Sequence, residues 1–192
     1  MGIGEVEARA AVFLDRDGVL NRAIVRDGKP YPPQTVEELD ILPDAAASLQ
    51  ALKDAGFVLI VVTNQPDVGR GRQTRSAVEE MHAKLSRSLP IDHFFVCYHD
   101  DVDACECRKP LPGLLFQAEK AHQLRLKDSF LVGDRWRDVD AGHAAGVRTI
   151  WIDYGYRERG PEHPPAARVK SLREAADWIL KAVESEVHEN GQ

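Results

Sequence analysis

Short, uncharged runs of apolar residues recur along the chain, and longer segments with a helical period separate them. Apolar runs of this length predict strands that are buried on both faces, as in a parallel sheet. The first run stops at two aspartates and a glycine, and later runs also end in polar residues. The predicted strands are residues 11–14, 57–63, 92–98, 129–132 and 147–152.

The segments between these strands predict helices. In the first of them, apolar residues recur at i, i+3, i+4 and i+7, and Gly56 is a natural helix end. Thr74 or Ser76 is expected to cap the second, because Ser76 and Glu79 have the spacing of a capping box. The predicted helices are, approximately, residues 43–55, 74–88, 112–124, 138–145 and 171–186.

The alternation of strands and helices predicts an α/β fold with a doubly wound parallel sheet. The chain has 192 residues, which suits one well-buried domain, so we expect residues 1–192 to form a single domain. Residues 22–40 form a long polar connection that is rich in turn residues. Connections of this kind inside compact domains are usually binding loops or lids.

The overall composition narrows the class of partner. The net charge is −6 and the basic residues are dispersed, so we expect no nucleic-acid partner. No apolar run reaches membrane-spanning length, and residues 1–9 lack the apolar core of a signal peptide. We therefore expect a cytoplasmic monomer that has no membrane partner and acts on a small molecule.

Polar groups stand at the ends of several predicted strands. Asp15 and Asp17 follow the first, Thr63 and Asn64 end the second, and Asp134 follows the fourth. In a parallel sheet these ends share one edge, where ligands bind in open α/β folds. Two close carboxylates repel each other unless a cation lies between them or one is protonated, so a divalent cation is the economical interpretation. An ordinary turn is the alternative, because Asp and Gly are common turn residues.

Three cysteines and a histidine lie close together in the sequence. Cys97, His99, Cys105 and Cys107 offer three thiolates and an imidazole, a complete tetrahedral Zn²⁺ set with no open position. Such a site is structural rather than catalytic, and it would fix the loop of residues 97–107. The alternative is three buried thiols and an incidental histidine.

Four short motifs resemble, in type and order, those of the haloacid dehalogenase (HAD) superfamily of phosphotransferases. The resemblance covers residues 11–152 and implies a HAD-like, Rossmann-type fold. The motifs are Asp15-x-Asp17-Gly18, Thr63, Lys109 and Gly133-Asp134-x-x-x-Asp138.

The resemblance implies a role for each of these residues. Asp15 would be the nucleophile that forms an aspartyl-phosphate, and Asp17 would be the general acid and base. Thr63 and Lys109 would hold the phosphoryl oxygens and stabilise the charge of the transition state. The implied cofactor is Mg²⁺, whose ligands would be Asp15, Asp17 through its backbone carbonyl, and Asp134, with Asp138 as a further candidate.

With the cysteine loop included, the motifs look like those of the D-glycero-D-manno-heptose 1,7-bisphosphate 7-phosphatases. These are small members without a cap domain that act in the biosynthesis of lipopolysaccharide-core or S-layer heptose. Histidinol-phosphate phosphatases share the motifs and are the rival assignment. The substrate-binding residues that the resemblance implies are Arg16, Asn64, Gln65, Arg70, Arg108 and Arg135.

Basic residues in the predicted site loops favour a sugar bisphosphate, because the ammonium group of histidinol phosphate would need acidic neighbours. Residues 22–33 do not align with the usual substrate loop of the family, and Pro66 and Asp67 replace smaller residues. A third hypothesis is a catalytically silent, zinc-stabilised binding module, although all reacting groups are present. The basic loop residues are Arg22, Arg26, Lys29, Arg70, Arg72, Arg108 and Arg135.

Overall fold

In the computed structural model, which describes residues 8–190, six parallel strands form the central sheet. The first strand of the sequence lies inside this sheet, with the next two strands of the sheet on one side of it and the last three on the other. This order is that of a doubly wound fold, with a switch point beside the first strand. Across the sheet the strands are β5 (His93–Cys97), β4 (Val58–Asn64), β1 (Ala11–Leu14), β6 (Phe130–Gly133), β7 (Arg148–Ile152) and β8 (Ala167–Val169).

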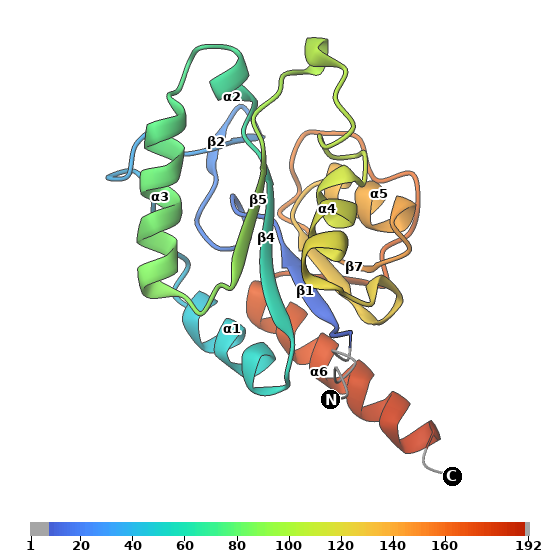
Figure 1. The fold of residues 1–192 in the computed structure, drawn as a ribbon. Coiled ribbons are helices and arrows are strands. Elements are labelled where there is room, and N and C mark those ends of the chain that lie inside the picture. Colours follow the sequence, from blue (N-terminus) through green and yellow to red (C-terminus); the bar gives the residue numbers. More distant parts are fainter. Residues whose placement is uncertain (1–7, 191–192) are drawn as a thin grey trace, which may run out of the picture.

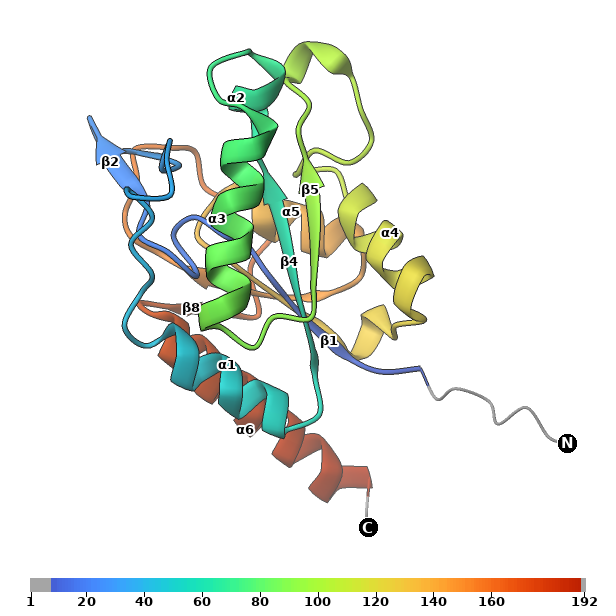
Figure 2. The same ribbon diagram turned by 60° about the vertical axis from the view of Figure 1, so that its left-hand side comes forward.

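Helices cover both faces of this sheet, as Figures 1 and 2 show. One face packs against α1 (Ala45–Asp54), α3 (Arg75–Ser88) and α6 (Leu172–Asn190). The other face packs against α4 (Gly113–His122) and α5 (Trp136–Ala144). Within β1, Val12 and Leu14 enter the first core and Ala11 and Phe13 the second, because side chains alternate along a strand. Both faces of β1 are therefore apolar, and its sequence is an unbroken apolar run.

The structure confirms the α/β fold with its parallel sheet, and it adds elements that the sequence did not indicate. The polar connection after β1 contains a hairpin of β2 (Ile24–Arg26) and β3 (Lys29–Tyr31). The strand β8 is only three residues long and pairs with β7 at the edge of the sheet. Short helical turns also occur at α2 (Pro66–Gly69), Asp101–Asp103 and Leu126–Asp128. Apolar periodicity is not measurable in such short pieces.

The first turn of α3 settles which residue caps the helix. The Thr74 hydroxyl accepts a hydrogen bond from the Ala77 amide at 3.1 Å, so Thr74 is the N-cap. The expected capping box of Ser76 and Glu79 is wrong, because Ser76 is the second residue of the helix and donates to the Glu80 carboxylate. Two helices also begin at other residues than expected: α1 at Ala45 and α5 at Trp136.

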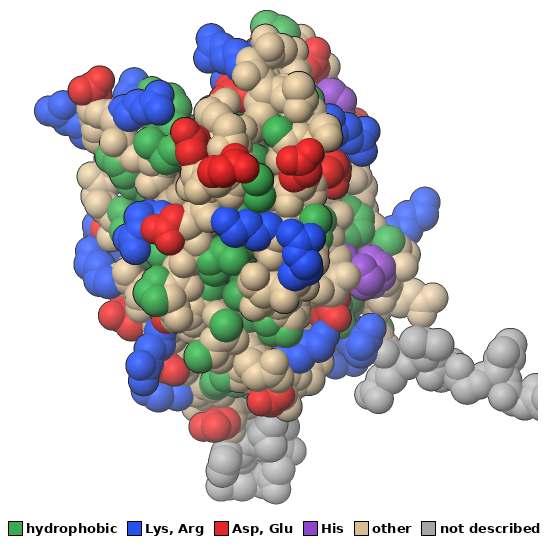
Figure 3. Space-filling view, turned by 90° about the vertical axis from the view of Figure 1, so that its left-hand side faces the viewer, with side chains coloured by type: hydrophobic (Ala, Val, Ile, Leu, Met, Phe, Trp, Pro, Cys, Tyr) green, Lys and Arg blue, Asp and Glu red, His purple; other side chains and the backbone are tan. Residues whose placement is uncertain are grey.

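Among residues 8–190, no helix combines the length and the apolar character that a membrane span requires. On the face drawn in Figure 3, basic and acidic side chains are intermixed rather than gathered by sign. That face therefore lacks the continuous basic stripe that is typical of nucleic-acid binding.

Helix α5 approaches the sheet closely at Gly142. A Cβ atom at this position would lie 2.2 Å from Cγ2 of Thr149 and 3.2 Å from Cδ2 of Leu131. Gly142→Ala would gain at most about 1 kcal/mol of helix propensity, whereas overpacking costs about 1–3 kcal/mol. We expect a lower free energy of unfolding in denaturant titration. Adding Thr149→Ser removes Cγ2 and should recover most of the loss; a double variant as unstable as Gly142→Ala would contradict this explanation.

Candidate active site

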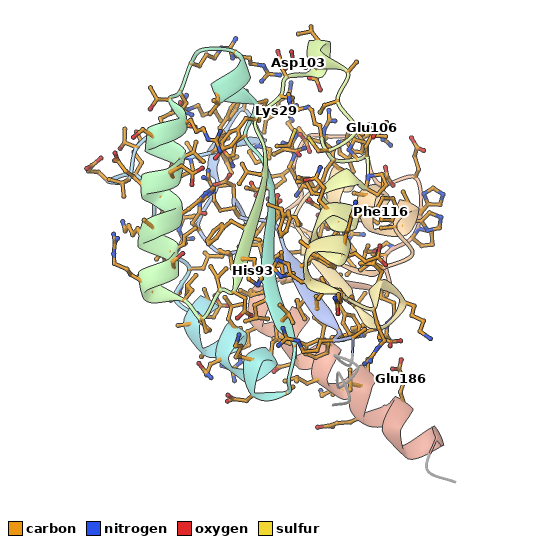
Figure 4. All side chains as sticks on the ribbon, in the orientation of Figure 1. Lys29, His93, Asp103, Glu106, Phe116 and Glu186 are labelled. Atoms are coloured by element: carbon orange, nitrogen blue, oxygen red, sulfur yellow. The ribbon has the colours of Figure 1, made fainter. Side chains whose placement is uncertain are left out.

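Polar side chains from several strand ends meet in a cavity of about 310 Å³. Its lining includes residues of α2 and of the loop after β5, and these two elements lie at the same end of the sheet (Figure 1). Figure 4 labels Lys29 of the β2–β3 hairpin and Asp103 of that loop at the same end. The residues that line the cavity at or near the strand ends are Asp15, Asp17, Asn64, Lys109, Asp134 and Asp138.

The turn after β1 passes close to the carboxylate of Asp134. Gly18 has φ +85°, a conformation that other residues rarely adopt, and a Cβ there would lie 1.9 Å from Oδ2 of Asp134. The Leu20 and Asn21 amides both donate to the Arg16 carbonyl, which closes the turn. The glycine of the Asp-x-Asp-Gly motif thus leaves room for the Asp134 carboxylate.

Three buried carboxylates form a group that could hold a metal ion. Oxygens of Asp15, Asp134 and Asp138 all lie within 4.8 Å of one another. Neither Asp134 oxygen has a partner at ordinary hydrogen-bond geometry among the described residues, although the nearby Tyr156 hydroxyl acts to lower the pKa of Asp134. Burial, together with the charges of Asp15 and Asp138, raises the pKa of Asp134 well above its usual range. Burial likewise raises the pKa of Asp15 to about 6, although the positive charge of Lys109 opposes this. A hard divalent cation such as Mg²⁺ suits this oxygen set and would remove the repulsion.

Lys109 is the buried cation of the site, with a side chain only 2% exposed. Its Nζ lies 3.0 Å from Oδ1 of Asp15 and 2.5 Å from Oδ1 of Asp138, and it donates to the Val62 carbonyl at 2.8 Å. Burial opposes its charge, but the two carboxylates outweigh that effect and raise the pKa of Lys109. Asn64 exchanges two hydrogen bonds with the backbone of Lys109, at 3.0 and 3.1 Å, and so positions the lysine.

The carboxylate of Asp17 accepts hydrogen bonds from three neighbouring side chains. Arg16 donates to both of its oxygens, at 3.1 and 2.9 Å, while Asn21 and Gln65 donate at 2.9 Å each. Burial alone would raise the pKa of Asp17, but Arg16 and these hydrogen bonds hold it below its usual value. Gln65 also donates to the Thr63 hydroxyl at 2.9 Å.

His82 on α3 contacts the buried guanidinium group of Arg16. Its Nε2 lies 3.5 Å from NH1 of Arg16, and its ring stacks on Phe94 at 4.7 Å between centroids. Burial, aided by the charge of Arg16, lowers the pKa of His82 to about 4. The neutral imidazole can therefore accept a hydrogen bond from the guanidinium group. Nothing in the sequence pattern indicated this residue.

The cysteine loop forms a second compact ligand group. The Sγ atom of Cys105 lies 3.7 Å from that of Cys97 and 3.5 Å from that of Cys107. Nδ1 of His99 lies 3.6 and 3.3 Å from the Sγ atoms of Cys97 and Cys107. Tetrahedral Zn²⁺ with ordinary bond lengths has S–S edges of about 3.8 Å and S–N edges of about 3.6 Å. The four side chains fit the donor set of such a site.

Basic side chains surround the mouth of the cavity, and half of them are paired with carboxylates. Among the described residues, Lys29, Arg72 and Arg137 line the cavity without an ion pair. Arg22 and Arg26 do not line it. The ion pairs of the rim are Arg70 with Asp67, Asp100 and Asp101, Arg108 with Asp101, and Arg135 with Glu158.

Known proteins resemble the chain over almost its whole length. A family model for HAD-hydrolase-like proteins matches residues 106–175. A D-glycero-beta-D-manno-heptose-1,7-bisphosphate 7-phosphatase of Helicobacter pylori (strain J99) is 32% identical over 182 residues, which are 91% of this chain and 99% of the relative. The enzyme of the same name from Yersinia pestis is 34% identical over 186 residues, 90% of each chain. The chain belongs to this family of HAD phosphatases.

Solved structures of the family share the fold. The D,D-heptose 1,7-bisphosphate phosphatase of B. bronchiseptica, in complex with magnesium and phosphate, superposes with a TM-score of 0.74. It is 26% identical and covers 90% of this chain and 99% of its own. The enzyme of Burkholderia thailandensis, also 26% identical with the same coverage, gives a TM-score of 0.62. The predicted class, a phosphoric monoester hydrolase of the HAD superfamily, is thereby confirmed.

The structure places the site residues predicted for this phosphatase in two groups. Arg16, Thr63 and Gln65 do not line the cavity: Arg16 is fully buried, and all three lie in the network behind Asp17. Sequence reasoning also missed Arg137, although its place two residues after Arg135 could have indicated it. Those that line the cavity are Asp15, Asp17, Asn64, Arg70, Arg108, Lys109, Asp134, Arg135 and Asp138.

Asp134 and Asp138 have different hydrogen-bond partners, and we propose on this ground that Asp134 is the metal ligand. Asp138 already contacts Lys109 and accepts from the Arg135 amide at 3.1 Å, whereas Asp134 has no such partner. We expect Asp134→Asn to weaken Mg²⁺ binding at least about a hundredfold and Asp138→Asn to weaken it far less. In EDTA, Asp134→Asn should melt no lower than wild type, because it removes an unpaired buried charge.

Thermal unfolding with and without Mg²⁺ measures both effects. Wild type should gain thermal stability with added Mg²⁺, because a ligand that binds only the native state stabilises it. Asp134→Asn should lose this gain, and Asp138→Asn should keep it. If Asp138→Asn lost more of the Mg²⁺-dependent gain in thermal stability than Asp134→Asn, Asp138 and not Asp134 would be the metal ligand.

Proposed function

We propose that the protein hydrolyses the C7 phosphate of D-glycero-D-manno-heptose 1,7-bisphosphate in a Mg²⁺-dependent reaction. The observation that carries the proposal is the placement of Asp15 at the end of β1, against Lys109 and beside the buried Asp134, which has no ion pair among the described residues. The relatives named for this substrate support the choice of sugar. The reaction belongs to the biosynthesis of the heptose of lipopolysaccharide.

The nucleophile in this proposal is Asp15. Its carboxylate attacks phosphorus to form an aspartyl-phosphate, and water then cleaves that intermediate. Lys109 contacts Asp15 and would hold the phosphoryl oxygens as charge develops. Mg²⁺, held by the carboxylates of Asp15 and Asp134 and the carbonyl of Asp17, would neutralise charge on the phosphoryl group.

Asp17 would move the proton in both steps. Its low pKa keeps it ionised in the free protein, which suits a base that takes a proton from the attacking water. To act as the acid it must first be protonated. An anionic phosphate ester bound nearby raises the pKa of a carboxyl group, so substrate binding itself favours this protonation.

The charges of the rim argue against histidinol phosphate as the substrate. Each acidic rim residue, Asp67, Asp101 or Glu158, is paired with an arginine. Among the described residues the unpaired charged groups of the rim are cations, and they would repel the ammonium group of histidinol phosphate. A second phosphate group on the substrate fits these unpaired cations better than an ammonium group does.

A substrate panel tests the proposal. Phosphate release with Mg²⁺ should be fastest on heptose 1,7-bisphosphate and much slower on heptose 7-phosphate, histidinol phosphate and a small aryl phosphate. Asp15→Asn is the control. This substitution should abolish turnover on every substrate, because an amide cannot attack phosphorus. A preference for histidinol phosphate would contradict the proposed substrate, and turnover by Asp15→Asn would contradict the nucleophile.

Arg108 should act on the part of the substrate that does not react. Its side chain lines the cavity and is held by Asp101 at 2.8 Å. A charge-assisted hydrogen bond contributes about 1.5–3 kcal/mol. We therefore expect Arg108→Ala to lose about ten- to a hundredfold more kcat/KM on the bisphosphate than on the aryl phosphate. Arg108→Lys should recover little, because lysine lacks the planar fork. Equal losses on both substrates would show that Arg108 serves the reacting phosphate or the loop.

We also propose that Cys97, His99, Cys105 and Cys107 hold a structural Zn²⁺. Purified protein should carry about one zinc per chain by elemental analysis. Removing it should lower the melting temperature and raise KM, because the loop that carries Arg108 and Lys109 would lose its anchor. Cys105→Ser should reproduce both effects. Zinc-free protein of unchanged stability and KM would contradict a structural role.

The same thiolate cluster supports the remaining expectations about the protein's setting. Three thiolates remain reduced in the cytoplasm, where disulfides are rare, so we place the enzyme there. We further propose that it acts as a monomer, because the described chain supplies every group that the reaction uses.

A further inference from the structure

Arg137, in the first turn of α5, is a cation of the cavity that the proposed reaction does not use. It is half-buried, unlike the exposed Lys29 and Arg72. Among the described residues it has no ion pair, whereas Arg108 and Arg135 beside it each have one. A half-buried guanidinium group without a counter-ion is unusual, so the surroundings of Arg137 are informative.

The charges around Arg137 leave an excess of one positive charge. Burial lowers the pKa of Arg137, and the positive charge of Arg108 lowers it further. Asp101 opposes this, and Arg135 and Glu158 act with opposite signs. Together with Arg137 itself, the charged groups that act on it most strongly are three guanidinium groups and two carboxylates. Like charges gathered in this way favour the binding of an anion.

The position of Arg137 is fixed by two contacts. Its guanidinium group lies 4.4 Å from the centre of the Trp136 ring, and it donates to the Lys109 carbonyl at 3.4 Å. Arg108 precedes Lys109 in the sequence, so both arginines flank the lysine that faces the reacting phosphate. Arg108 and Arg137 also line a smaller cavity of about 170 Å³ beneath the cysteine loop.

Asp101 is the group that an incoming anion would displace. It accepts from Arg108 at 2.8 Å and from Arg70 at 3.4 Å, yet its side chain is 59% exposed. An exposed carboxylate is stabilised by water when it loses its partner, and exposed ion pairs are weak. A phosphate group can therefore replace Asp101 at the guanidinium groups without leaving a buried charge unpaired.

We infer that Arg137 determines specificity by binding, together with Arg108, the phosphate of the sugar bisphosphate that does not react. This inference rests on the proposed function. A phosphate dianion between the two planar guanidinium groups would receive paired hydrogen bonds from each and would neutralise the local excess of charge. Arg137 would then select bisphosphates over monophosphates of the same sugar.

The test compares heptose 1,7-bisphosphate with heptose 7-phosphate, which lacks only the second phosphate. The readout is the ratio of the two kcat/KM values. Arg137→Ala should reduce the wild-type ratio about ten- to a hundredfold, the range expected for a charge-assisted hydrogen bond. Arg137→Lys retains the charge and should recover only a small share of the ratio, and it stays interpretable if the alanine variant folds poorly.

Arg159→Ala is the matched control. Arg159 also stacks on Trp136, at 3.4 Å from the ring centre, but it pairs with Asp140 and does not line the cavity. Its substitution should leave the ratio unchanged. In Arg108→Ala/Arg137→Ala, the loss should be smaller than the product of the single losses, because both arginines bind one phosphate.

The outcomes separate this inference from the proposed function. Wild-type enzyme without a preference for the bisphosphate would overturn both. A wild-type preference that survives in Arg137→Ala, or falls equally in Arg159→Ala, would overturn the role of Arg137 alone. Independent, multiplicative losses in the double variant would contradict a phosphate shared with Arg108.

Discussion

The buried ammonium group of Lys109 is the interaction on which the site depends. It joins the end of β1 through Asp15, β4 through the Val62 carbonyl and α5 through Asp138. Removing one partner of a buried ion pair costs about 3–5 kcal/mol, because the other charge is left uncompensated. Here two carboxylates would be left. The same contacts that hold Asp15, the proposed nucleophile, therefore also stabilise the contact of three segments, and Asn64 keeps the lysine backbone in place.

The carboxylates of the site differ in their partners, and this difference assigns their chemistry. Asp15 and Asp138 share Lys109, and Asp17 is held by Arg16. Asp134 is buried and, among the described residues, has no ion pair, so it is the carboxylate whose charge a metal ion would stabilise most. The neutral His82 contacts Arg16 and so supports the ion pair of Arg16 with Asp17. Side chains that never line the cavity thus set the charge state of those that do.

The strand ends and the ligand types were predictable from the sequence, because apolar runs and short motifs are local signals. The fold of the sheet and the meeting of Asp15 with Asp134 followed from parallel topology alone. The direction in which a side chain points is not a local signal. Arg16 follows Asp15 in the sequence, yet its side chain turns into the core to hold Asp17. The role of His82 and the short strand β8 depend on tertiary contacts in the same way.

The rim of the cavity combines rigid backbone with exchangeable side-chain pairs. Arg70 joins α2 to the cysteine loop through Asp100 and Asp101, and Arg108 shares Asp101. Such exposed pairs contribute only about 0–1 kcal/mol each, so an incoming phosphate can replace a carboxylate easily. A Zn²⁺ ion in the loop would keep the backbone fixed while this exchange takes place. The described residues include no separate domain that could close over the cavity, so binding would then need only the exchange of a carboxylate for a phosphate at preplaced guanidinium groups.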